Sequence, residues 1–143
     1  MEKKFEFLEH VADAYVAAYG RSLAEAFQNA ALAMFELMTD ASKIEPRIEE
    51  EIVVEEWDEN ALLYNWLEQL LLKFEIEGKL LSEFKISELV QTEKGWRLQA
   101  KVSGELFDPK KHESRVEVKA VTYHQMEIGR RDDAYVVKFI LDL

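Results

Sequence analysis

The sequence predicts an α+β domain in which two main helices pack on a largely antiparallel β-sheet. Two stretches, residues 22–38 and 58–77, carry apolar side chains at the three- and four-residue spacing of amphipathic helices. Most of the remaining chain consists of short apolar or alternating segments separated by turn residues, which is typical of antiparallel strands. No linker or internal repeat divides the 143 residues, so we expect a single compact domain over residues 1–143.

Two predicted strands precede the first helix. Residues 4–8 and 14–19 are rich in apolar and aromatic side chains. Ser22 begins the helix, because Glu25 follows three residues later as a capping box requires. An apolar stripe predicts that this helix extends to about Met38.

An acidic strand and a second helix come next. Residues 47–57 centre on Ile52-Val53-Val54, and the surrounding stretch 45–59 contains eight acidic residues and one arginine. A strand so charged belongs at a sheet edge or has one strongly solvated face. Asp58 is a good N-cap for the following helix, and Gly78 suits its C-terminal cap. The wide apolar face of this helix predicts that it is largely buried.

Antiparallel strands fill the C-terminal half of the predicted fold. The predicted strands are residues 79–90, 96–102, 115–128 and 134–142. Residues 93–95 and 130–133 have the composition of turns. We expect Trp96 and Tyr123 to be core or sheet residues.

The charge of the chain argues against direct binding of nucleic acid. Eighteen Lys and Arg residues against 29 Asp and Glu residues give a formal net charge of −11. A domain that binds nucleic acid through backbone phosphates is usually basic. The acidic stretch 45–59 has two interpretations, a docking face for a basic partner or a solvated, solubilising face.

The composition also indicates in which compartment of the cell the protein is expected. The chain has no cysteine, which excludes disulfides, thiolate zinc sites and cysteine nucleophiles and suits a reducing compartment. The first ten residues lack the apolar run of a signal peptide, and no apolar run is long enough to span a membrane. We therefore expect a cytoplasmic protein with no membrane partner.

The side chains that could bind a metal or catalyse a reaction are carboxylates and a few histidines. Asp142 follows an apolar strand and stands beside the terminal carboxylate of Leu143, so the two repel unless a cation lies between them. Asp13 is either a turn former or a further ligand if the two ends of the chain meet. Such an oxygen-only set suits a hard divalent cation. His10, His112 and His124 lack the spacing of a helical metal pair, and each can be an ordinary loop or surface side chain.

Several motifs together resemble the archease family over essentially the whole chain. They are the opening Phe5-Glu6-Phe7-Leu8-Glu9-His10-Val11-Ala12-Asp13, Met38-Thr39-Asp40, the Gly104-Glu105 to His112-Glu113 region, Lys119-Ala120-Val121-Thr122-Tyr123-His124, and the closing strand that ends in Asp142-Leu143. The Lys119–His124 motif is the most specific of them.

The resemblance implies an accessory protein and not a free-standing enzyme. Archeases assist the RtcB-type RNA ligase of tRNA splicing and RNA repair, which joins 3′-phosphate to 5′-hydroxyl ends, and they promote its GTP- and metal-dependent guanylylation and repeated turnover. The resemblance also implies a divalent cation, calcium first and Mg²⁺ or Mn²⁺ otherwise, on Asp13, Asp142 and Leu143. The resemblance implies that this protein contacts RNA only indirectly, through the ligase.

Partner contacts are expected from His10, Lys111, His112, Lys119 and His124, with the two lysines near nucleotide or RNA phosphate. Two other functions remain open from the residues alone. One is a small metal-dependent phosphoesterase that uses His10, Asp13 and Asp142. The other is a general protein chaperone or adaptor, which would bind many unrelated clients.

Overall fold

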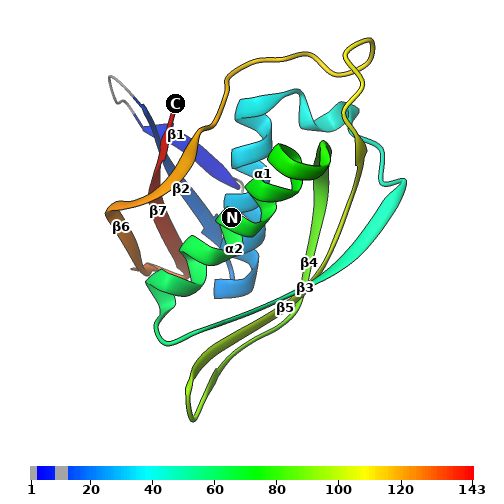
Figure 1. Ribbon diagram of the computed structural model, residues 1–143. Helices are drawn as coiled ribbons and strands as arrows, with labels where there is room; N and C mark the ends of the chain where they lie inside the picture. The colour runs from blue at the N-terminus through cyan, green and yellow to red at the C-terminus, as the bar shows by residue number, and fades with distance from the viewer. Residues whose placement is uncertain (1–2, 9–12) are drawn as a thin grey trace.

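The structure is a computed structural model that describes residues 3–8 and 13–143. Two sheets enclose a layer of two helices (Figure 1). The elements are β1 (Phe5–Leu8), β2 (Asp13–Gly20), α1 (Leu23–Met38), the 3₁₀ turn η1 (Ala41–Lys43), β3 (Ile48–Glu56), α2 (Glu59–Glu77), β4 (Lys79–Thr92), β5 (Gly95–Leu106), β6 (Ala120–Arg131) and β7 (Ala134–Asp142). The α+β class with two main helices is confirmed.

The strands of the described residues divide between two antiparallel sheets. One sheet has the order β1-β2-β7-β6 and the other has the order β3-β5-β4. Helix α1 packs against β2 on one side and β4 on the other, and α2 packs against β6 and β3. The expectation of one sheet was therefore incomplete, because the helices separate the strands into two layers.

Local capping sets the ends of both helices. The Ser22 hydroxyl accepts the Glu25 backbone N–H at 3.1 Å, and the Glu25 carboxylate accepts the Arg21 N–H at 2.8 Å. Asp58 caps α2 by accepting the Ala61 N–H at 2.7 Å. Gly78 ends α2 in the left-handed conformation, with φ of 70°. The predicted starts and ends of the helices are confirmed.

Trp66 of α2 joins the two helices within the core. It is fully buried, and its indole N–H donates to the backbone oxygen of Phe27 in α1 at 3.0 Å. Its ring meets Phe84 of β4 edge to face at a centroid distance of 6.3 Å. A single side chain thus contacts the other helix and a strand of the second sheet.

Two sequence predictions about strands have different outcomes. The acidic strand β3 does lie at a sheet edge, and its Glu49, Glu51 and Glu55 are exposed. The strand predicted over 115–128 begins only at Ala120. The Arg115 and Val116 backbone N–H groups donate instead to Met38 and Leu37 at the end of α1, at 3.0 and 3.1 Å. These bonds satisfy helix carbonyls that no residue of α1 can reach.

Candidate functional site

The first and last residues of two neighbouring strands bring the predicted carboxylates together. Asp13 begins β2 and Asp142 ends β7, and the antiparallel register places the two residues directly opposite each other. Opposed residues in a sheet project from the same face. Asp142 is exposed and Asp13 is partly buried. The meeting of the two ends, on which the candidate metal site depends, is thus present in the fold.

Residues next to this pair complete its surroundings. Strand β6 places Ala120 opposite Asp142 on the other side, and the Lys119 N–H donates to the Asp142 backbone oxygen at 2.8 Å. The Lys119 side chain is exposed. Leu143 follows directly and packs its side chain against the core. The fold therefore gathers Asp13, Asp142, Leu143 and Lys119 at one end of the sheet.

The donor set at this end consists of oxygen atoms. Two opposed carboxylates repel each other across strands, and a hard divalent cation relieves that repulsion. Within residues 3–8 and 13–143, no group of three or more His, Cys, Asp and Glu side chains is placed to hold a metal ion. Among the described residues the Asp13–Asp142 pair is the core of the candidate site, and the terminal carboxylate of Leu143 as a further ligand stays a prediction. His10 lies outside the described residues.

Lys111 and His112 lie in a different, buried ionic cluster around Glu105. The Glu105 carboxylate accepts hydrogen bonds from the Glu45 backbone N–H at 2.7 Å and the His112 Nε2 at 3.1 Å, and it pairs with Lys111 Nζ at 2.8 Å. His112 is 2% exposed, and its Nδ1 accepts the Asp108 N–H at 2.9 Å, which leaves the ring proton on Nε2. Both side chains are thus engaged within the protein, and their contact with a partner stays a prediction.

Glu105 is held strongly in its charged form. Burial by itself raises the pKa of this carboxyl. The hydrogen bonds from the Glu45 backbone, Lys111 and His112 outweigh burial and lower the pKa from 4.5 to about 2. The cluster ties the loop after β5 to the segment before β3.

The Glu105→Gln variant should be less stable than the wild type at neutral pH, by about 1.5–3 kcal/mol, because hydrogen bonds to a charged acceptor are lost. Since the folded-state pKa lies below the unfolded one, the wild-type advantage is full above 4.5 and is lost as pH falls towards about 2. Urea unfolding of both proteins across this range measures the difference. An advantage that persists at the acid end would contradict the assignment.

His124 lies apart from both the Asp13–Asp142 pair and the Glu105 cluster, in an irregular part of β6. The register of β6 with β7 is interrupted between Thr122 and Glu127, and Gln125 has a φ of 56°. Tyr123 and His124 are exposed there, with Tyr123 at 54%. Tyr123 is a sheet residue, as expected, but not a core residue, because its ring lies on the surface against Tyr64 of α2.

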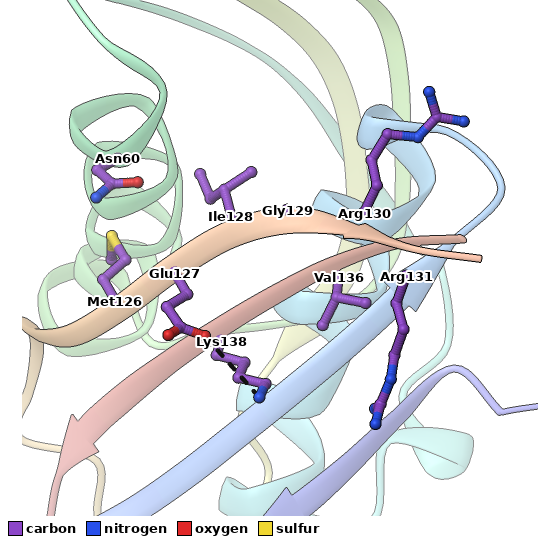
Figure 2. A pocket seen from close by; sticks show the side chains of 9 residues that line it. All are labelled: Asn60, Met126, Glu127, Ile128, Gly129, Arg130, Arg131, Val136 and Lys138. Atoms are coloured by element: carbon purple, nitrogen blue, oxygen red, sulfur yellow. Dashed lines mark ion pairs between the residues drawn. The ribbon is translucent and has the colours of Figure 1, made fainter. Parts of the chain in front are cut away.

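A hollow of about 710 Å³ at the opposite end of β6 was not predicted from the sequence. Its lining combines one side chain of α2 with residues of β6 and β7: Asn60, Met126, Glu127, Ile128, Gly129, Arg130, Arg131, Val136 and Lys138 (Figure 2). The sequence feature that could have indicated this hollow is the adjacent pair Arg130 and Arg131, which stands out in an acidic chain.

The cations of this hollow do not converge on one point. Figure 2 shows Arg130 and Arg131 extending from opposite sides of β6. Arg130 lies 4.8 Å from the centre of the Tyr135 ring, and Lys138 Nζ lies 3.9 Å from Glu127. The hollow therefore lacks the concentrated positive charge of an anion site.

Comparison with known sequences gives a consistent result over the full length. The model of the Archease protein family matches residues 5–143. A "Protein archease" of Sulfurisphaera tokodaii is 47% identical over 141 residues, which cover 99% of each chain. A "Protein archease" of Thermococcus kodakarensis is 43% identical over 142 residues, again covering 99% of each.

Two solved structures share the fold. The solution structure of Methanobacterium thermoautotrophicum protein 1598 superposes with a TM-score of 0.86 at 44% identity, and the match covers 98% of this chain and 99% of that one. A crystal structure from Thermotoga maritima, described as "an archease, possible chaperone", has a TM-score of 0.63 at 20% identity, with 95% and 94% covered. The second likeness concerns the fold alone.

Proposed function

The chain belongs to the archease family, and on that premise we propose that it is a cytoplasmic, non-catalytic accessory protein that activates an RtcB-type RNA ligase. In this role it promotes the GTP- and metal-dependent guanylylation of the ligase and its repeated turnover in tRNA splicing and RNA repair. The observation that carries the proposal is the opposed pair Asp13 and Asp142 beside the end of the chain. The pair offers a metal-binding surface at the position of the family's motifs.

The proposal assigns a divalent cation to Asp13, Asp142 and the terminal carboxylate of Leu143. Calcium is the first choice, because a site made only of oxygen ligands suits a hard cation, and Mg²⁺ and Mn²⁺ are the alternatives. When bound, the cation would neutralise the two opposed carboxylates and link the ends of β2 and β7. The exposed Asp142 and Lys119 would then present a fixed surface to the ligase.

Charge supports a protein partner in preference to free RNA. The net charge of −11 repels phosphate and attracts a basic protein surface. Part of the acidic stretch is already neutralised, since Glu50 pairs with Lys73 and Lys79, at 3.0 Å in each case. The exposed glutamates of β3 remain available for steering a basic partner.

The direct test is multiple-turnover RNA joining by the RtcB-type ligase of the same organism, with GTP and metal and with substoichiometric amounts of this chain. We expect strong stimulation of joining and faster guanylylation. If neither changes, the activator proposal is wrong. Suppression of the aggregation of several unrelated proteins would then favour the chaperone function named for the Thermotoga maritima relative.

A further inference from the structure

The outward face of α2 carries four residues at regular intervals of four. Tyr64, Glu68, Leu72 and Ile76 therefore form one inclined row on the helix surface, in which each residue neighbours the next. The opposite side of α2 is buried against the core, whereas Leu72 is 39% exposed and Ile76 is 76% exposed. Exposed large apolar side chains in line on a helix are typical of a surface that contacts another protein.

A tyrosine from β6 extends this row of residues. The rings of Tyr64 and Tyr123 stack face to face, with centroids 4.2 Å apart and planes at 3°. Tyr123 lies in the irregular stretch of β6 that also contains Gln125. We call Tyr64, Glu68, Leu72, Ile76 and Tyr123 the α2 ridge.

Carboxylates surround the aromatic end of the α2 ridge. Burial is the main cause that raises the pKa of Tyr123, and the nearby charges of Glu56, Asp58 and Glu68 contribute. The Glu56 carboxylate is fixed beside α2 by a 2.7 Å hydrogen bond from Asn65. Stacked rings with acidic neighbours form a favourable environment for a guanidinium or ammonium group.

A shallow groove lies along the α2 ridge. It has a volume of about 400 Å³ and runs along α2 from Asn65 to Glu77, with Leu72 and Ile76 in its lining. Its cation Lys73 lies 3.0 Å from Glu50 and 3.4 Å from Glu77, so its charge is compensated within the protein. The groove therefore offers the apolar side chains of Leu72 and Ile76 between the carboxylates of Glu68 and Glu77.

We propose that the α2 ridge is the docking surface for a basic amphipathic helix of a partner protein. The surface extends over several turns of α2, and anchors spaced by four residues match the rows by which helices pack on each other. Apolar side chains of the partner helix would cover Leu72 and Ile76. Its Lys or Arg side chains would lie over the tyrosine pair and against Glu68. Identifying this partner with the RNA ligase rests on the proposed function.

The surface can be tested without the ligase. The probe is a synthetic helix-forming peptide of leucine and lysine, about five turns (~18 residues) long, and the control peptide carries glutamate in place of lysine. Titration of the wild-type chain is followed by amide chemical shifts. We expect the lysine peptide to shift the signals of the α2 ridge and the glutamate peptide to leave them unchanged. Shifts confined to the acidic strand β3, or no shifts, would overturn the proposal.

Variants show which contacts carry the binding. The double variant Leu72→Glu/Ile76→Glu should weaken binding of the lysine peptide at least about tenfold, although it adds negative charge, because the apolar anchors are lost. Tyr123→Ala should weaken it less. Val90→Glu is the matched control, since Val90 of β4 is an exposed apolar residue, at 43%, outside the α2 ridge. Equal binding by the double variant and the control would count against the docking surface.

The same variants separate the docking proposal from the activator proposal. If the wild type stimulates the ligase and the double variant does not, the ligase is the partner. If both stimulate equally, the identification with the ligase is wrong, whatever the peptide shows. If the wild type fails to stimulate, the activator proposal is wrong, and the peptide titration still decides whether the α2 ridge binds a basic helix.

Discussion

Asp142→Asn is expected to lower the stimulation of the RNA ligase by about 100-fold, because it removes one of the two opposed carboxylates from the proposed cation site. Asp142 is exposed, so the amide should fit without a change in fold. The loss should appear in multiple-turnover joining and in guanylylation. Asp13→Asn should behave in the same way.

A readout apart from ligase activity tests the cation directly. Calcium at about 100 times its Kd should raise the free energy of unfolding of the wild type by about 2.7 kcal/mol and leave Asp142→Asn unchanged. Without divalent cations the variant should be at least as stable as the wild type, because carboxylates directly opposed across strands destabilise a sheet. Thermal unfolding with and without calcium measures both effects.

Asp133→Asn is the matched control. Asp133 is exposed in the turn between β6 and β7, at the other end of β7, so the variant makes the same change of charge away from the site. It should keep full stimulation of the ligase and the full calcium effect. Loss of the calcium effect in both variants would mean that overall charge, and not the Asp13–Asp142 pair, governs the binding.

Trp66→Ala should lower the free energy of unfolding by about 3–5 kcal/mol. Trp66 is fully buried, and the variant leaves a cavity between α1, α2 and β4 and removes the indole hydrogen bond to the Phe27 backbone oxygen. Because natural domains are stable by only about 5–15 kcal/mol, this loss is a large part of the total. Urea unfolding followed by circular dichroism measures it.

Trp57→Ala offers a control with the same substitution. Trp57 lies just before the N-cap of α2 and is 76% exposed, so its removal should change the free energy of unfolding by less than about 0.5 kcal/mol. A similar loss in the two variants would contradict the role assigned to Trp66 in joining the helices.

The helices could be located from the sequence because their signals are local. Ser22 and Asp58 cap residues three positions away, and Gly78 ends α2 through its own backbone conformation. The edge position of β3 could likewise be inferred from its density of charge. The motifs that gave the resemblance are also read along the chain, so the family could be inferred before the fold was known.

The strand predicted from residue 115 shows where prediction from local sequence patterns fails. Alternation suggested a strand from that point, yet the Arg115 and Val116 N–H groups bind carbonyls at the end of α1. Which acceptor a backbone donor finds depends on an element far away in the sequence. Alternating side chains cannot indicate that choice.

The candidate site depended on both kinds of information. The sequence was enough to infer the class of the fold, the ends of the helices and the oxygen chemistry of the proposed ligands Asp13, Asp142 and Leu143. The fold was needed to show that Asp13 lies opposite Asp142, that Glu105 binds Lys111 and His112, and that Tyr123 stacks on Tyr64. Strand pairing between β2 and β7 sets the first of these contacts, the loop after β5 sets the second, and the packing of α2 on β6 sets the third, and no local pattern in the sequence indicates any of the three.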